Sequence, residues 1–196
     1  MAQTGPITND TSSLVLGLAQ VRIGASESNI TSQGAVLSST DSIGAMANTK
    51  FVGSTEWYKH LSGFPQLDDY VIPLRDSASI ECAFEEISPA NMALAMGYDP
   101  SDTPYSSMEA HSGEIPLGGR TAPSYVRSEV VYTFPGSDAS TMTILFPRAQ
   151  VTSSVEVDLQ KEEAANVPIT IEAKRADGEN GDDVWNNKPL GAIIFL

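Results

Sequence analysis

The chain has 196 residues with 25 acidic and 11 basic side chains, a formal net charge of −14. Its length fits one domain better than two, so we expect a single domain over residues 1–196. Proteins that recognise nucleic acids neutralise phosphates with lysine and arginine, so this charge disfavours such a function. No apolar run approaches the roughly 20 residues of a membrane helix. The N-terminus lacks the features of a secretory signal, so we expect folding in the compartment of synthesis.

The first third of the chain has few charges and many small polar residues. Residues 1–12 are predicted to form a flexible arm, and residues 14–23 a strand with a bulge or twist near Ala19. Residues 24–75 are predicted to be a long loop region that contacts other subunits or rings. A loop of this length in a compact domain needs a function or a partner.

The rest of the chain alternates between apolar and polar residues, which is the period of strands buried on one face. Ile80 and Phe84, for example, alternate with Glu81 and Glu85. Strands are predicted over residues 77–87, 126–134, 141–150, 153–159 and 168–174, with a last apolar run over 192–196.

A short helix is predicted directly after the first of these strands. Ser88 can cap it, Pro89 suits its first position, and Gly97 stands where a helix ends. Because repeated one-sided alternation is typical of antiparallel sheets wetted on one face, the predicted fold class is mainly β. We expect an antiparallel β-sandwich or partly closed barrel with one short flanking α-helix and long loops.

The sequence contains little that would build an active site. His60 and His111 are the only histidines, and they lie far apart in the sequence. Cys82 has no histidine nearby and is interpreted as a buried small hydrophobic residue. Residues 177–183 are rich in acids, but Lys188 stands where a calcium loop needs a bidentate acid. We therefore assign no catalytic, cofactor-binding or metal-binding residue, and do not expect an enzyme.

Several segments, in this order, resemble the tail tube (major tail) proteins of long-tailed bacteriophages. The likeness covers residues 75–196 well and the first third only in style. It rests on residues 75–81 (RDSASIE), 84–87 (FEEI), the helix ending Met96-Gly97, residues 155–164 (VEVDLQKEEA), 167–173 (VPITIEA) and 188–195 (KPLGAIIF).

The resemblance implies a structural protein of the virion tail that is made in the host cytoplasm. It implies homohexameric rings that stack into a hollow tube, with strands from all six subunits closing one inner β-barrel. Viral DNA would pass through during ejection without being bound specifically. The implied partners are other copies of the chain, a tape measure protein in the lumen during assembly, and tail terminator and tail-tip proteins. No membrane and no cofactor are implied.

Two groups of residues become candidates for this function. Acids on the polar faces of strands are candidates for a lumen lining that repels phosphates, although ordinary solvent exposure is the alternative. Aromatic residues between 51 and 70 are candidates for a ring-stacking interface, because interfaces are enriched in them; the alternative is a loop folded over its own core. The lumen candidates are Glu81, Glu85, Glu129, Glu156, Asp158 and Glu172, and the stacking candidates are Phe51, Trp57, Tyr58, Phe64 and Tyr70.

Three other functions fit parts of the sequence. A tail-end terminator or adaptor protein would form one ring without polymerising. A carbohydrate-binding β-sandwich module could stack Trp57 and Tyr58 on sugars, although such modules are usually secreted. A hydrolase on a β-scaffold is disfavoured by the scarcity of histidine.

Overall fold

The computed structural model describes residues 17, 19–102, 104–109, 112–118, 122–135, 140–157 and 165–196. The flexible arm predicted over residues 1–12 lies outside this range, as do His111 and Asp158. So does most of the first half of the strand predicted over residues 14–23.

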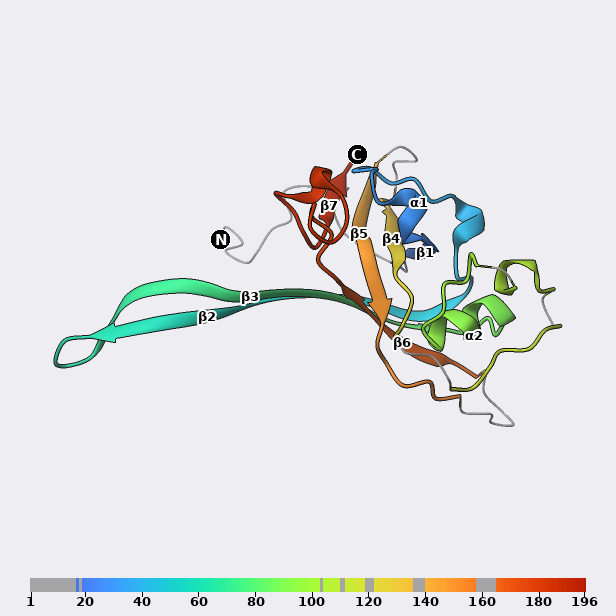
Figure 1. Ribbon diagram of the computed structural model, residues 1–196, viewed down its shortest axis with the longest axis horizontal. Coiled ribbons are helices and arrows are strands. Elements are labelled where there is room, and N and C mark those ends of the chain that lie inside the picture. The colour runs from blue at the N-terminus through green and yellow to red at the C-terminus, as the bar shows by residue number, and fades with distance from the viewer. Residues whose placement is uncertain are drawn as a thin grey trace, which may run out of the picture.

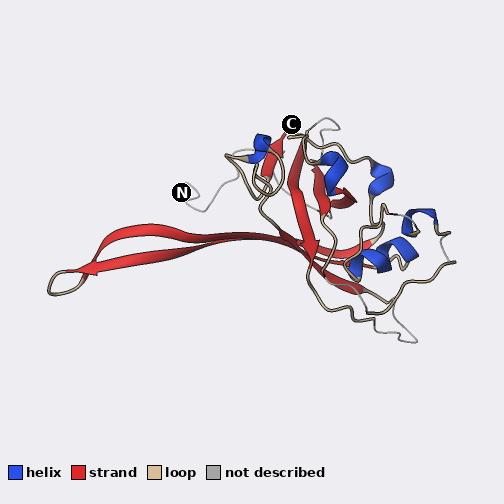
Figure 2. Ribbon diagram, in the orientation of Figure 1, coloured by secondary structure: helices blue, strands red, loops and turns tan. Residues whose placement is uncertain are grey.

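The described chain is mainly β, as predicted, with a few short helices (Figure 2). The strands are β1 (Gln20–Ala25), β2 (Met46–Ser62), β3 (Leu67–Phe84), β4 (Val126–Thr133), β5 (Thr141–Val151), β6 (Val167–Ala173) and β7 (Ala192–Phe195). The helices are α1 (Ser26–Asn29), α2 (Pro89–Ala95) and three 3-10 turns, η2 (Ser39–Asp41), η3 (Tyr105–Ser107) and η4 (Asp183–Trp185). No described helix is long and apolar enough to cross a membrane.

All seven strands belong to one antiparallel sheet in the order β1-β4-β5-β6-β3-β2, with β7 joined to β5. β5 pairs with β4 along one edge. Its other edge pairs first with β7 and then, from Ala149 to Val151, with β6. The sheet is not closed into a barrel, since its end strands β1 and β2 do not pair with each other.

One hydrophobic core lies between the two ends of this sheet. Ile80 and Phe84 of β3 pack there with Val21 of β1, Val130 of β4 and Phe146 of β5. The short segment 42–45 connects the two ends through its backbone. The amide of residue 43 donates to the carbonyl of Val21 (3.0 Å), and the amide of Glu85 donates to the carbonyl of residue 45 (2.9 Å).

Helix α2 forms where the sequence predicts it. The Ser88 side chain accepts a hydrogen bond from the Asn91 amide at 3.2 Å, and Pro89 opens the helix. Gly97 ends it with a φ of +79°, a left-handed conformation that glycine adopts without strain. Leu94 is buried in the core, so the helix covers one end of the sheet.

Two predictions about regular structure are wrong. The long loop predicted over residues 24–75 is instead dominated by the hairpin of β2 and β3, and only residues 30–45 are largely irregular. The strand predicted over 153–159 does not form in residues 153–157. There β5 has already ended at Val151, and the exposed Val157 finds no core to enter. The predicted strands over 126–134, 141–150, 168–174 and 192–196 are present to within two residues at each end.

A buried ion pair on β4 holds the irregular segment around residues 29–37 against one face of that strand. Arg127 and Glu129 are both fully buried, with Nε and Oε1 2.7 Å apart. The Arg127 guanidinium donates to the carbonyl oxygens of Asn29, Ser32 and Gly34 at 2.6–2.9 Å. Glu129 accepts from the amides of residues 36 and 37 at 3.0 and 3.1 Å. Each charge therefore has several partners, as burial of a charge requires.

We predict that Arg127→Met destabilises the protein by about 3–5 kcal/mol, because Glu129 would remain as an uncompensated buried charge. Urea unfolding followed by circular dichroism measures this. The matched control is Lys50→Met, which breaks an exposed pair with Glu81 (2.8 Å) and should cost less than about 1 kcal/mol. Equal losses in the two variants would contradict the structural role given to Arg127.

Candidate functional site

A β-hairpin arm projects from the body of the molecule (Figure 1). β3 pairs with β6 only from Ser79 to Phe84, so from Leu67 to Ala78 its one described neighbour is β2. We define the hairpin arm as residues 56–75, beyond the directly paired Thr55 and Asp76, whose side chains share a 2.7 Å hydrogen bond. Gly63 opens the turn at its tip with a φ of +84°.

Large apolar side chains lie on both faces of the hairpin arm. Directly paired residues of an antiparallel ladder point to the same face. Within the arm the ladder has two register shifts, one after Glu56 and one after His60, which interrupt any simple alternation. One face carries the pairs Tyr58–Ile72 and His60–Tyr70, and the other carries Trp57–Pro73 and Lys59–Val71.

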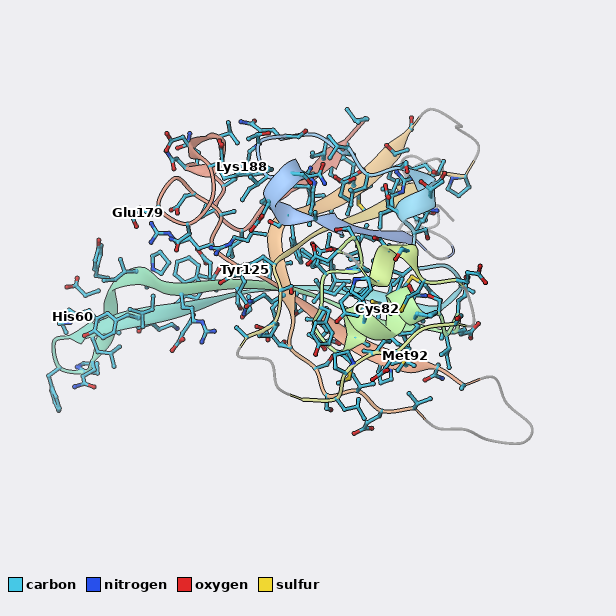
Figure 3. All side chains as sticks on the ribbon, turned by 45° about the vertical axis from the view of Figure 1, so that its right-hand side comes forward. His60, Cys82, Met92, Tyr125, Glu179 and Lys188 are labelled. Carbon is cyan, nitrogen blue, oxygen red and sulfur yellow. The ribbon has the colours of Figure 1, made fainter. Side chains whose placement is uncertain are left out.

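These side chains are exposed in the single chain. Trp57 is 54%, Tyr70 61% and Phe64 fully exposed, and six more large apolar residues of the arm are exposed by 39% or more. Figure 3 shows side chains on both sides of the arm around His60, far from Cys82 in the body. Soluble monomers rarely expose a contiguous apolar surface of this kind, which marks an interaction site.

The hairpin arm carries little of the chain's charge. It contains three acids, Glu56, Asp68 and Asp69, and two bases, Lys59 and Arg75, which gives a net charge of −1 against −14 for the whole chain. Lys59 and Asp68 face each other across the strands at 3.4 Å. Burying this surface against another molecule would therefore remove few unpaired charges from water.

An apolar groove lies at the base of the arm, lined by residues of β2, β5 and β7 among others. Two adjoining cavities of about 190 and 170 Å³ share Phe51 and Ile144. Exposed residues of β7 border them, because Ile193 is paired with Ile144 and Phe195 with Met142. We call this surface the base groove. It is lined mainly by Phe51, Ala78, Ile80, Val130, Tyr132, Met142, Ile144, Phe146, Leu190 and Ile193.

The predicted stacking residues all lie on the β2–β3 hairpin, but in two places. Trp57, Tyr58, Phe64 and Tyr70 belong to the arm, whereas Phe51 lies at its base, 39% exposed, with its ring 6.3 Å from that of Phe146. The sequence did not indicate the base groove. The sequence feature that could have pointed to this groove was the apolar run over 192–196, which we interpreted only as a last strand.

The structure does not gather the predicted lumen acids on one face. Glu81 and Glu172 do share a face of β3 and β6, but each pairs with a lysine, at 2.8 Å to Lys50 and 2.6 Å to Lys174. The hydrogen bond from Lys174 lowers the pKa of Glu172.

The remaining lumen candidates do not extend that face. Glu129 is fully buried against Arg127, so it lines no surface. Glu85 and Glu156 are exposed outside the strands, and Asp158 lies outside the described residues. The predicted set of six acids therefore does not form one surface on the single chain.

Reactive groups are scarce among the residues that the structure describes. Burial raises the pKa of the Cys82 thiol from 9.0 to about 12. His60 lies on the arm, where it is paired with Tyr70. No group of three His, Cys, Asp or Glu side chains in the described ranges is placed to hold a metal ion.

No known family model matches this chain, and no curated protein matches its sequence significantly.

We predict that Trp57→Ser combined with Tyr70→Ser changes the free energy of unfolding of the dilute monomer by less than about 0.5 kcal/mol, because both side chains are exposed. Urea unfolding measures this. The control, Ile80→Ala, should cost about 2–5 kcal/mol, since Ile80 is fully buried. A comparable loss in the double variant would mean that the arm packs on its own core.

We predict that Cys82 resists thiol reagents in the folded protein at pH 8. With a pKa of about 12 the thiolate fraction is very small, and burial blocks access. Absorbance after addition of a disulfide reagent measures the reaction. Full and rapid labelling in 6 M guanidinium chloride is the control, and equally rapid labelling without denaturant would contradict the buried position.

Proposed function

We propose that this protein is a structural subunit of a phage tail tube, which assembles with copies of itself through the hairpin arm. The observation that carries the proposal is an arm with large apolar residues on both faces and no described part of its own chain packed on either. Such a surface becomes stable in water when another molecule covers it.

The unpaired edges of the sheet support self-assembly. Among the described residues no strand pairs with the outer edge of β2, or with the edge of β3 away from β2 between Leu67 and Ala78. The second edge of β7 also has no described partner. Long apolar edges of this kind are templates for pairing with another chain. Closing them in a ring of six copies, whose strands complete a shared β-barrel, satisfies them without open-ended aggregation.

The charge of the chain suits a conduit. At −14 per copy, a ring of six carries a large negative charge, and a negatively charged channel repels phosphates so that DNA passes without adhering. Glu81 and Glu172, although paired with lysines, remain the candidates that share a strand face. In this function the tape measure protein occupies the lumen during assembly, and the terminator and tail-tip proteins cap the ends.

A carbohydrate-binding module is a weaker explanation of the same surface. Sugar-binding aromatics form one platform, whereas here Trp57 and Tyr58 point to opposite faces of a thin hairpin. A terminator or adaptor ring would use the same contacts but would stop at one ring, so the length of the assembly separates it from a tube subunit.

We predict that the purified chain at high concentration forms rings or hollow filaments in negative-stain electron micrographs. Raising NaCl from about 50 to about 500 mM should promote assembly, because it shortens the Debye length roughly threefold and screens repulsion between negatively charged copies. Single rings alone would indicate the terminator function. A monomer under every condition, including in the presence of the other tail proteins, would refute the proposal.

The matched control is a variant in which residues 56–75 are replaced by Asn-Gly. Thr55 and Asp76 are directly paired, so a two-residue turn can join them without disturbing the body. We expect this variant to fold with the stability of the wild type in dilute solution and to remain monomeric. Tubes of normal length from this variant would exclude the arm from assembly.

A further inference from the structure

The chain exposes an apolar projection and an apolar hollow that cannot meet within one molecule. The hairpin arm extends away from the body (Figure 1). The base groove lies where the arm begins, since Phe51 and Ala78 line it. The arm strands cover residues 56–62 and 67–75 and so extend roughly 23–30 Å. The tip therefore lies too far from its own groove to fill it, whereas the tip of a second copy is under no such constraint.

The base groove suits a large apolar side chain. Its two cavities measure about 190 and 170 Å³, and an apolar cavity of about 150 Å³ accepts a benzene-sized ring. Their walls are almost wholly aliphatic and aromatic. The rim includes Ile193, which is 48% exposed.

The tip of the arm presents side chains of the matching kind. Phe64 is fully exposed in the turn, with Leu61 (49%) and Leu67 (67%) beside it. The nearest charges are those of Lys59, Asp68 and Asp69. Lys59 and Asp68 lie 3.4 Å apart and so can partly offset each other when water is removed.

We propose that the base groove of one copy receives the arm tip of another, with Phe64 entering beside Ile193. This inference rests on the proposed function and names the partner surface that the arm requires. The contact is heterologous, because tip and groove are different surfaces. A bound pair keeps one free groove and one free tip for further copies, so the contact propagates into closed rings or filaments.

A lipid surface is a poorer partner for the same tip. The arm has unpaired backbone edges, which cannot be satisfied in hydrocarbon but can pair with another protein strand. Asp68 and Asp69 lie at the tip, and the chain as a whole carries −14, so an anionic membrane would repel it.

The test uses two variants that each lack one half of the contact. Phe64→Glu leaves the groove intact and places a charge at the tip. Ile193→Glu leaves the tip intact and places a charge in the groove. Sedimentation velocity should show that each variant alone weakens self-association by about 30-fold or more, the effect of losing a hot-spot residue. The control, Leu117→Glu, changes a residue that is 85% exposed outside the groove, and it should assemble like the wild type.

Mixing the two variants gives the decisive result. The intact tip of the Ile193→Glu copy should bind the intact groove of the Phe64→Glu copy. The assembly should stop at two copies, because the free tip and the free groove of the pair both carry a substitution. A mixture that stays monomeric, or an Ile193→Glu chain that assembles normally, would overturn the inference. If Ile193→Glu assembles normally, the proposed function still stands, because the wild type still forms its assembly.

A wild type that never self-associates would overturn the inference and the proposed function together. If that monomer binds anionic lipid vesicles and Phe64→Glu does not, the arm tip binds membranes instead.

A second measurement does not depend on how well Ile193→Glu folds. In a Cys82→Ala background, Phe64→Cys combined with Ile193→Cys should form disulfides between copies under mild oxidation. Phe64→Cys combined with Leu117→Cys should form them at least tenfold more slowly. Equal rates would contradict the pairing of tip and groove.

Discussion

The constraint on which the molecule depends is that a two-stranded hairpin cannot bury its own side chains. Two strands form a single layer, so residues on both faces stay in water unless something packs on each face, and an isolated hairpin is only marginally stable. Here the layer carries Trp57 on one face and Tyr58 and Tyr70 on the other. These side chains leave water only when other molecules cover both faces, which the proposed stacking of copies would provide.

The body of the protein holds this arm in a fixed direction. β3 is one strand of 18 residues whose last part is buried: Ile80 and Phe84 are in the core, and Ser79 to Phe84 pair with β6. The arm is therefore the continuation of a core strand and not a separate loop. An arm fixed in this way loses less conformational freedom on docking than a flexible loop would, which favours association.

The sequence predicts best those elements of the fold that have a regular pattern of one buried face or clear capping residues. The strand over 168–174 has one buried and one more exposed face, the helix after Ser88 has clear capping residues, and both were predicted. The strand over 126–134 was predicted from its alternation although both of its faces are buried. The arm was missed because its apolar residues occupy both faces and two register shifts break the period. Glu129 was assigned to a polar face because its alternation looks regular. Only the three-dimensional fold shows that residues 29–37 cover that face and provide Arg127 and Glu129 with partners.

In the proposed assembly, the uneven distribution of charge along the chain would favour contacts through the arm. The hairpin arm has a net charge of −1, so the remaining 176 residues carry −13 of the total of −14. Copies that approached body to body would meet strong repulsion, whereas an arm that approaches a body meets much less. At low ionic strength this difference favours contacts through the arm over side-by-side aggregation of sheets, even though both expose apolar edges. The same acids that would keep DNA from adhering would thus also restrict how the subunits meet.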